Sequence, residues 1–460
     1  MPTHHTYHAY PTQPIARLLP DTLTISPDGV LEIASHPLPA LARQYGTPLY
    51  IFDRATILNA CASYRQAFQK YYSASPVQIL YASKAYLSPL IAQLMAEQGL
   101  GLDIVSGGEL LLAQRAAFPM EHVLFHGNNK SEEELRLALA LGVGRIVLDN
   151  WSELERLTRI AREAGLRPKV LLRVTPGVET DTHRYLQTGH AASKFGFPLS
   201  NGEAKAALRQ ILNDGQLHLM GLHTHIGTML RETYPYEEAL LRLFVVANEV
   251  SDEMHWWPEE ISSGGGWAID TIDNAKTPDI EELAQALQAT MQLALSTPGK
   301  AKPVPRLIIE PGRSLIARAG VAMYRIGARK VTFGGVTYLF VDGGMADNIR
   351  PALYGARYTA LAVEHALASP EENVCIAGRY CESGDILIDN VMLPGLREED
   401  LLLIPGTGAY CLPMGSNYNL VPRPAVLLVD EQRVQVMERR ETYDDVLARY
   451  QGFNRKGQDV

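Results

Sequence analysis

The amino-acid sequence predicts an α/β protein in which a (β/α)8 barrel is followed by a mainly β domain. Between about residues 76 and 315, eight short β-branched runs alternate with amphipathic helical stretches, the order of elements that a closed parallel barrel requires. After residue 315 the helical period mostly disappears, and strand-like segments follow one another between turns. An open doubly wound sheet permits the same alternation, but the strand count favours the barrel.

The predicted barrel strands are short apolar runs. They cover Val77–Tyr81, Gly101–Val105, His122–His126, Arg145–Leu148, Lys169–Val174, Leu219–His225, Glu259–Ser263 and Arg306–Glu310. Capping-box spacings, and a proline after a capping residue, predict helix starts between them. These starts are Ser131 with Glu134, Ser152 with Glu155, Ser200 with Glu203, and Thr277 with Pro278.

Polar residues or glycines lie at or just beyond the carboxyl end of every predicted barrel strand. They are Lys84, Asp103, His126, Asp149, Arg173, His225, the Gly264–Gly266 tract and Glu310. In a barrel these ends meet at one mouth, where catalytic groups are found. One or two polar residues could lie at strand ends by chance. A polar residue or glycine at the end of all eight strands is less easily explained by chance.

The pattern divides the chain into four parts. We predict a mobile extension over residues 1–22, a segment over 23–52 that pairs with the β domain, the barrel over 53–315, and the β domain over 316–460. The extension is rich in Pro, His and Thr and lacks the apolar stretch of a signal peptide. The loops of the β domain contain Arg, Tyr, Cys and Glu, as in ADNIRPALYGARY and GRYCESGD.

Composition excludes several classes of function. The net charge of -9 argues against a general nucleic-acid or anionic-membrane surface. No run of 18 apolar residues occurs, so no membrane-spanning helix is expected. The four cysteines form no C-x-x-C pair, so neither a disulfide framework nor a zinc site is signalled. A cytoplasmic, reducing location fits this cysteine usage best.

Each residue that could take part in catalysis also has an ordinary structural interpretation. Lys84 in YASKA is either a salt-bridged lysine at the barrel rim or an amine nucleophile that forms a Schiff base. His223 and His225 in HTHIG could bind a metal or stack on a flat cofactor, but no further His/Cys cluster supports a metal, and we expect none. Cys381 could be an ordinary half-buried thiol.

Two turns add to this set. ISSGGG at 261–266 either needs positive φ angles or cradles a phosphate with backbone N–H groups. IIEPGRS at 308–314 places an acid before a tight turn, where Glu310 and Arg313 could simply pair. A phosphate cradle, an amine, a ring stacker and a central acid are together what pyridoxal phosphate requires. We therefore predict this cofactor, with Glu310 keeping its ring nitrogen protonated.

The same motifs resemble one known family. In the family's order, the chain contains YASKA, GLDIVSGGEL, RVTPGV, the TG…SKFGF stretch of 188–197, HTHIG, SGGG, EPGRS, NIRPALYGARY, CESGD, GAY and SNYN. These motifs resemble the diaminopimelate decarboxylases, fold-type III pyridoxal-phosphate enzymes related to the ornithine and arginine decarboxylases, over about residues 30 to 447. The resemblance implies an alanine-racemase-like barrel followed by a β domain. It also implies a homodimer with active sites at the subunit interface.

The resemblance implies a role for each cofactor-binding residue. Lys84 would form the Schiff base, His225 would stack on the ring, and Glu310 would bond its nitrogen. Asp103 and Glu109 would support Lys84 and its surroundings. The phosphate would be bound by Thr228, Gly264, Gly265, Gly266, Tyr410 and the turn formed by Glu310, Pro311, Gly312 and Arg313.

The substrate residues implied by the resemblance come mainly from the β domain. Cys381 of the partner subunit would protonate the carbanion after carbon dioxide leaves. The far end of the substrate would be held by Arg313, Arg350, Tyr354, Glu382 and Tyr410. Two arginines suit the distal carboxylate of diaminopimelate, because arginine binds carboxylates through two parallel hydrogen bonds. Glu382 suits its distal ammonium.

The expected reaction is therefore decarboxylation of meso-2,6-diaminopimelate to L-lysine and carbon dioxide, the last step of lysine biosynthesis. A decarboxylase of ornithine, arginine or a polyamine precursor is the alternative, and it should have an arginine-poor distal site. A racemase would place a cation at the ring nitrogen, and a catalytically inactive binding protein should have lost Lys84 or Cys381. Three departures from the family's usual pattern, at Thr228, Ala268 and Gly415, touch no reacting group.

Overall fold

The structure is a computed structural model that describes residues 15–72, 77–178, 193–272, 277, 279–296 and 302–451. Most of the predicted N-terminal extension, residues 1–14, lies outside the described residues. The chain forms two compact units. One comprises Ile57–Asp270 and Lys276–Ile316, and the other Met1–Thr56, Thr271–Ala275 and Ala317–Val460.

The first unit is the barrel. Among the described residues, eight parallel strands pair in a ring in the order β5-β6-β7-β8-β9-β11-β12-β13, and β13 pairs with β5 to close it. Their bounds are β5 Val77–Ala82, β6 Gly101–Ile104, β7 Val123–Phe125, β8 Arg145–Leu148, β9 Lys169–Thr175, β11 His218–His223, β12 Glu260–Ser262 and β13 Arg306–Ile309. The predicted fold class is confirmed, and each strand agrees with its predicted range to within two residues at either end.

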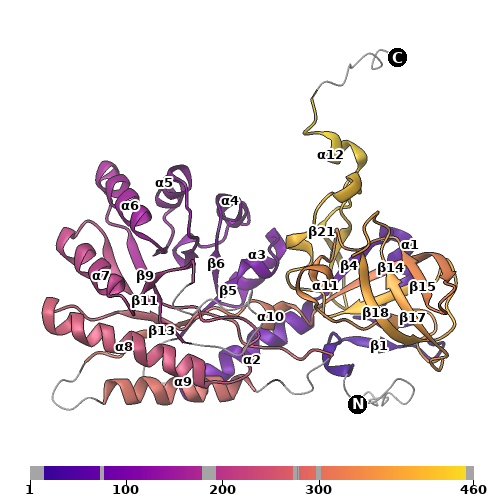
Figure 1. Cartoon of the computed structure of the whole chain (residues 1–460), viewed down its shortest axis with the longest axis horizontal. Coiled ribbons are helices and arrows are strands. Elements are labelled where there is room, and N and C mark those ends of the chain that lie inside the picture. The colour runs from indigo at the N-terminus through magenta and orange to yellow at the C-terminus, as the bar shows by residue number, and fades with distance from the viewer. Residues whose placement is uncertain are drawn as a thin grey trace. The chain divides into compact units, whose positions relative to one another are not determined.

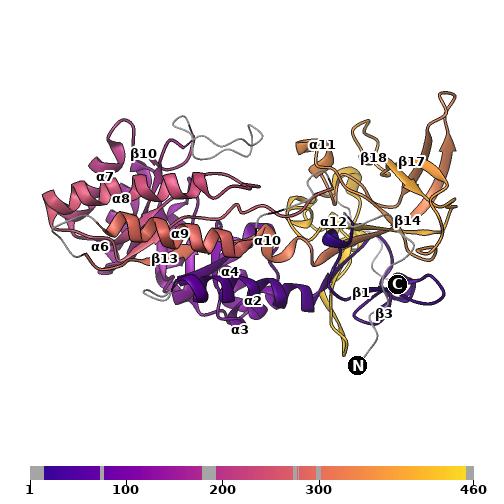
Figure 2. The same cartoon turned by 90° about the horizontal axis from the view of Figure 1, so that it is seen from below.

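Helices surround the ring of strands, as two perpendicular views show (Figures 1 and 2). They are α2 Arg54–Tyr71, α3 Pro89–Glu97, α4 Gly107–Arg115, α5 Glu132–Ala140, α6 Trp151–Ala164, α7 Glu203–Asp214, α8 Tyr234–Met254, α9 Ile280–Leu295 and α10 Arg313–Ile316. Shorter elements are η2 Ser83–Ala85, η3 Met120–His122 and β10 Phe197–Pro198, which pairs with β9. In α6, the buried residues Leu154, Leu157, Ile160 and Ala161 recur at helical spacing, which gives the helix an apolar face for the sheet.

The barrel interior is packed with side chains. Six inward-facing residues from six strands form one buried cluster: Leu80, Leu124, Val147, Leu171, Met220 and Ile308. Such layers of branched apolar side chains make a barrel a packed core, not a pore. The polar residues at the strand ends therefore lie next to a closely packed apolar core.

The second unit is mainly β. Its large sheet has the order β18-β17-β15-β14-β4-β20-β21, and β19 pairs with β14 and β16. The bounds are β4 Leu49–Asp53, β14 Gly320–Val331, β15 Thr337–Val341, β16 Leu361–Ala362, β17 Glu372–Ala377, β18 Ile386–Leu393, β19 Leu401–Pro405, β20 Ala425–Val429 and β21 Val434–Glu438. β4 comes from the segment before the barrel, and it pairs antiparallel with β14 and parallel with β20.

Smaller elements complete this unit. They are η1 Ala16–Leu18, β1 Leu23–Ile25, β2 Leu31–Ile33, β3 His36–Pro37, α1 Leu38–Tyr45, α11 Arg350–Tyr354, η5 Leu412–Met414, η6 Tyr418–Leu420 and α12 Tyr443–Leu447. β1, β2 and β3 form a separate three-stranded sheet. One buried cluster joins Leu31 and Ile33 of β2 to Leu401 and Leu427 of the large sheet. No described helix has both the length and the apolar character needed to cross a membrane.

The predicted helix starts were only partly right. Ser131 and Glu134 form the predicted capping box of α5. The prediction at Ser152 is wrong, because Asn150 caps α6 two residues earlier. The prediction at Ser200 is also wrong, because Gly202 occupies the N-cap of α7. Asp279, not Thr277, caps α9, and Pro278 lies outside the described residues.

Candidate active site

Four buried polar side chains converge at the carboxyl ends of the barrel strands. Asp103 lies in β6, His126 directly follows β7, His223 ends β11, and Glu310 directly follows β13. All four are buried. Because parallel strands end on the same side of a barrel, residues far apart in the sequence meet here.

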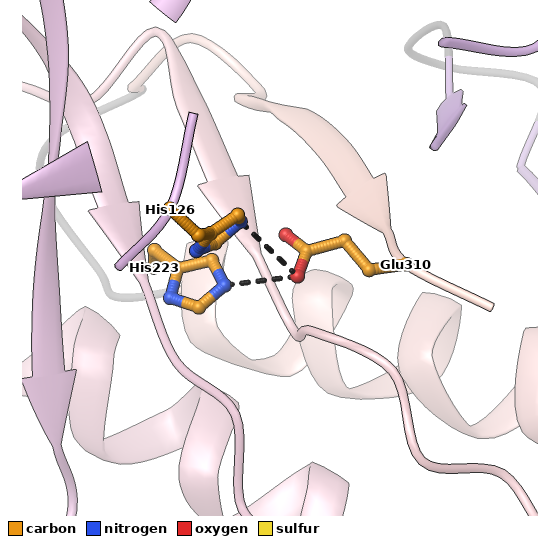
Figure 3. A group of neighbouring side chains, drawn as sticks. All are labelled: His126, His223 and Glu310. Atoms are coloured by element: carbon orange, nitrogen blue, oxygen red, sulfur yellow. Dashed lines mark hydrogen bonds and ion pairs between the residues drawn. The ribbon is translucent and has the colours of Figure 1, made fainter. Parts of the chain in front are cut away.

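Glu310 is the centre of this group (Figure 3). Its Oε2 lies 3.0 Å from Nε2 of His223 and 3.6 Å from Nε2 of His126. Its Oε1 accepts a hydrogen bond of 2.7 Å from the Ser262 hydroxyl. The carboxylate thus has hydrogen-bonded partners on both oxygens, which a buried charge requires.

The two buried acids of the group have opposite pKa shifts. Burial alone would raise the pKa of Glu310, but His223, Ser262 and Lys84 together hold it below its usual value. Burial raises the pKa of Asp103 to about 8; the charge of Glu310 adds to this effect, and that of Lys84 opposes it. At neutral pH the pair therefore holds one proton, on Asp103, and one negative charge, on Glu310.

Lys84 lies in η2, just beyond the end of β5, and its side chain is exposed. The preceding residue, Ser83, donates its hydroxyl to the Asp103 carbonyl. Glu109 acts from the start of α4, where its carboxylate accepts the Val105 N–H at 2.6 Å. Burial raises the pKa of both Asp103 and Glu109, and the positive charge of Lys84 opposes this rise in each, so these three groups interact.

His225 is half-buried two residues after β11, and its Nδ1 accepts the Gly265 N–H at 3.2 Å. Burial, followed by the charges of Lys84 and Arg173, lowers the pKa of His225 well below its usual value. The ring is therefore neutral at neutral pH. Since Nδ1 accepts a hydrogen bond, the ring hydrogen of the neutral imidazole lies on Nε2.

The glycine tract packs backbone against backbone. A Cβ on Gly265 would lie 1.9 Å from the Glu310 carbonyl oxygen, and one on Gly266 would lie 2.0 Å from the Gly227 carbonyl oxygen, next to Thr228. Gly264 has a φ of +72° and donates its N–H to Ser262. Close approach and positive φ both require glycine here. The N–H groups of Gly264 and Gly265 already have protein acceptors.

The turn after Glu310 packs against the strand that leads to Lys84. The Ala82 N–H donates to the Pro311 carbonyl at 3.0 Å, and a Cβ on Gly312 would lie 3.0 Å from that of Ala82. Arg313 then begins α10. The YASKA and EPGRS motifs are therefore neighbours.

In the β unit, Arg350 lies among aromatic rings. Its guanidinium carbon is 5.4 Å from the ring centroid of Tyr354 and 5.9 Å from that of Tyr410. Its Nε donates to the Tyr358 hydroxyl at 3.2 Å. Tyr410 has a left-handed φ of 62°, a conformation that costs energy for a non-glycine residue and is often found at functional sites. Arg350, Tyr354 and Tyr410 therefore form one cluster.

Cys381 and Glu382 are both exposed on the loop between β17 and β18. Asp385, at the end of this loop, is buried and accepts the N–H groups of Tyr380 at 2.8 Å and Met345 at 2.7 Å. A Cβ on Gly344 or Gly378 would meet the Asp385 carboxylate at 2.4 Å or less. Asp385 thus ties the Cys381 loop to the segment that leads into α11.

Four further residues support the site, although sequence reasoning assigned no role to them. His126 and Ser262 contact Glu310, and Tyr358 contacts Arg350. Asp385 instead holds the loop of Cys381, through the N–H groups of Met345 and Tyr380. His126 was recognisable as a polar residue at a strand end, and Asp385 is part of the CESGD motif. Ser262 and Tyr358 gave no comparable signal, because only their contacts distinguish them from other hydroxyl-bearing residues.

The metal interpretation of HTHIG requires its two histidines to converge. Among the described residues, the group with metal-compatible spacing contains His126, His223 and Glu310, with ligand atoms within 4.8 Å of one another, and it does not include His225. His223 lies edge-on to His126, with ring centroids 4.7 Å apart. The two histidines of the motif thus have different surroundings.

A cavity of about 630 Å³ lies at the other end of the barrel. Its lining includes the first residues of several strands, among them Val77, Gly101, Arg145 and Arg306. Both arginines form ion pairs with Glu260. Catalytic groups of barrels lie at the carboxyl ends of the strands, so this cavity is not the candidate site.

Comparisons with known proteins show which family the chain and its fold resemble. Residues 54–317 match the family described as "Pyridoxal-dependent decarboxylase, pyridoxal binding domain". The chain is 42% identical to a diaminopimelate decarboxylase from Bacillus subtilis, over 91% of this chain and 94% of that protein. It is 41% identical to one from Synechocystis sp., over 94% and 93% respectively. The crystal structure of diaminopimelate decarboxylase from M. jannaschii in complex with L-lysine superposes with a TM-score of 0.86, at 32% identity, covering 93% of this chain and 97% of that one.

Proposed function

We propose that this chain, which belongs to the diaminopimelate decarboxylases within the pyridoxal-dependent decarboxylase family, converts meso-2,6-diaminopimelate into L-lysine and carbon dioxide. The observation that carries the proposal is the buried, charged carboxylate of Glu310 at the mouth of the barrel, held by His223 and Ser262. This reaction is the last step of lysine biosynthesis.

The residues of the barrel mouth fit pyridoxal phosphate. When bound, this cofactor withdraws electrons from the α-carbon of an amino acid, so that the bond to the carboxylate can break. A charged Glu310 would keep the ring nitrogen protonated, which this electron withdrawal needs. Asp103 Oδ1, His126 Nε2 and His223 Nδ1 are buried and have no hydrogen-bond partner among the described residues. Such atoms are typical of a site that a polar ligand completes.

Each residue of the barrel has a separate task in this proposal. Lys84 would hold the cofactor covalently through its amine, and the neutral ring of His225 would stack on it. The Gly266 N–H and the Arg313 turn would bind the phosphate, since the Gly264 and Gly265 N–H groups are engaged with Ser262 and His225. Thr228, beside Gly266, would add a hydroxyl.

The β unit would supply the residues that recognise the substrate. Arg350, with Tyr354 and Tyr410 around its guanidinium, suits a distal carboxylate. Glu382 suits a distal ammonium, and the Cys381 thiol would return a proton to the α-carbon. Ornithine and lysine lack the distal carboxylate, and a site built for a polar group rejects analogues without it by roughly 10⁴–10⁵-fold.

We further propose a cytoplasmic homodimer in which Cys381 and Glu382 complete the site of the other subunit. No disulfide joins any of the four cysteines, all of which lie in the described part of the chain, as expected in a reducing compartment. Both residues are exposed in the single chain, which leaves them available to another subunit.

The deciding experiment measures carbon dioxide release by the purified protein with added pyridoxal phosphate. The substrates compared are meso-diaminopimelate, L-ornithine, L-lysine and L-arginine. Release from diaminopimelate alone, with L-lysine formed, is the expected result. Release from another substrate would overturn the role of Arg350, and release from none of them would exclude decarboxylation.

A further inference from the structure

Two buried atoms beside Glu310 face each other without a hydrogen bond. Asp103 Oδ1 and His126 Nε2 are 3.6 Å apart, and neither has a hydrogen-bond partner among the described residues. Both side chains are less than 10% exposed. Two such atoms at this separation need only a small approach to form a hydrogen bond.

We propose that Asp103 and His126 share one proton, as a neutral carboxylic acid that donates to the Nε2 lone pair of a neutral imidazole. His126 is then a positioning residue, and the negative charge of the Asp103–Glu310 pair stays on Glu310 alone. The inference deepens the proposed function, because Glu310 is the group expected to face the cofactor's ring nitrogen.

His126 lies equally near to both acids, so its Nε2 can form a hydrogen bond with only one of them. Its Nε2 lies 3.6 Å from Glu310 Oε2 as well as from Asp103 Oδ1. A hydrogen on Nε2 would be drawn to Glu310, the charged acid, and would leave Asp103 Oδ1 without a hydrogen-bond partner among the described residues. A lone pair on Nε2 instead accepts the Asp103 proton, and it leaves the Glu310 Oε2 to the His223 N–H at 3.0 Å.

The charges around both groups agree with this arrangement. Burial raises the pKa of Asp103, and burial lowers that of His126 far below its usual value, so both are neutral at neutral pH. The charged or titratable groups that face Asp103 are Lys84, Glu109, His126, Arg173 and Glu310. Those that face His126 are Lys84, Asp103, Lys130, Arg173, His223 and Glu310.

The position of the proton has a chemical consequence. Two ionised carboxylates that both lie 3.6 Å from the same nitrogen of His126 repel each other, so one of them must give up its charge. If Glu310 held the proton, it could not act as an anion toward a protonated ring nitrogen. A proton held between Asp103 and His126 removes that competition, and it does so without any change at Glu310.

Infrared difference spectroscopy tests where the proton lies, because a protonated carboxyl has a C=O stretching band that a carboxylate lacks. We would titrate the cofactor-loaded protein, and then the cofactor-free protein, from about pH 6 to about pH 10, on both sides of the Asp103 pKa of about 8. A band that disappears near pH 8, and that is absent in Asp103→Asn, is the expected result. Asp149→Asn is the matched control: Asp149 is equally buried but lies 3.6 Å from the Arg173 guanidinium, and its loss should leave the band in place.

Variants at His126 test whether this residue accepts the Asp103 proton or only fills space beside it. His126→Phe keeps a ring but removes the acceptor, so the band should disappear at a lower pH, whereas His126→Gln restores an acceptor and should move it back. Glu310→Gln should also lower the pH of this transition, since the charge of Glu310 raises the pKa of Asp103.

Three results would overturn the proposal: no protonated band at neutral pH, a band that survives in Asp103→Asn but vanishes in Glu310→Gln, or identical titrations of His126→Phe and the unmodified protein. None of these readouts uses turnover. A failure here is therefore distinguishable from a failure of the proposed decarboxylation, which carbon dioxide release tests separately.

Discussion

At the scale of single residues, Glu310 owes its charge to its neighbours. A buried carboxyl without partners would be neutral, but His223 and Ser262 hold the two oxygens of Glu310, and its pKa is lowered. His225, two residues after His223, is engaged by a glycine N–H instead. The two histidines of this short motif thus have different roles. His223 forms a hydrogen bond with Glu310, and His225 is expected to stack on the cofactor ring.

The first prediction concerns a substitution that removes the charge of Glu310 and keeps the shape of its side chain. Glu310→Gln should lower kcat by roughly 10²–10³-fold, the loss typical of removing one electrostatic partner of a developing charge. The visible absorbance of the bound cofactor should remain, because Lys84 is unchanged. Steady-state carbon dioxide release and an absorbance spectrum check the two parts. Glu259→Gln, an exposed acid just before β12, is the control, and an equal kcat in both variants would exclude the proposed role of Glu310.

At the scale of elements, a single buried acid, Asp385, positions a loop. Asp385 holds the loop of Cys381 against the segment before α11 through two backbone N–H groups and two glycines. The Arg350 and Tyr354 side chains that α11 carries therefore have a fixed relation to the Cys381 loop within the β unit. Cys381 adds a hydrogen bond of its own, from its N–H to Asn419 Oδ1 at 3.4 Å.

The second prediction concerns this tie. Asp385→Ala removes the acceptor of the buried Tyr380 N–H and of the half-buried Met345 N–H, and the loss of such a partner costs about 1–3 kcal/mol for a buried group. The KM for diaminopimelate should rise, and the alkylation rate of Cys381 should change, while the affinity for pyridoxal phosphate stays near that of the unmodified protein. Asp389→Ala, an exposed acid on β18, is the matched control. If Asp385→Ala left KM and the alkylation rate unchanged, Asp385 would have no positioning role.

The third prediction tests a helix start. The side chain of Ser131 accepts the Glu134 N–H at 3.1 Å, whereas Ser152 lies inside α6 behind its cap Asn150. Ser131→Ala should destabilise the first turn of α5 by about 1 kcal/mol and so speed its amide exchange by about fivefold. Ser152→Ala, the matched substitution, should leave the exchange of the first turn of α6 nearly unchanged. Hydrogen exchange resolved by segment measures both, and equal effects would refute this account of the two caps.

At the scale of the whole molecule, the sequence allowed prediction of elements better than of contacts. Alternation and strand count predicted the barrel, because a parallel strand buried on both faces is a continuous apolar run. Two capping boxes were predicted wrongly, because Asn150 and Gly202 compete for the same helix starts and spacing alone cannot rank them. The tie at Asp385 and the contact of Ser262 with Glu310 depend on folded distances, which no local pattern contains.

The last prediction tests the proposed dimer. Lys84 belongs to the barrel unit and Cys381 to the β unit, and in the proposed homodimer each site combines Lys84 of one subunit with Cys381 of the other. Lys84→Ala alone should lose the cofactor absorbance and all turnover, and Cys381→Ala alone should keep the absorbance and lose most turnover. In a twofold dimer formed from equal amounts of both variants, half of the molecules are mixed, and each has one site with both residues intact. Co-expression of the two variants should therefore restore roughly a quarter of the unmodified activity. If each site instead drew both residues from one subunit, mixing would restore nothing beyond the average of the two variants, and the shared site would have to be abandoned.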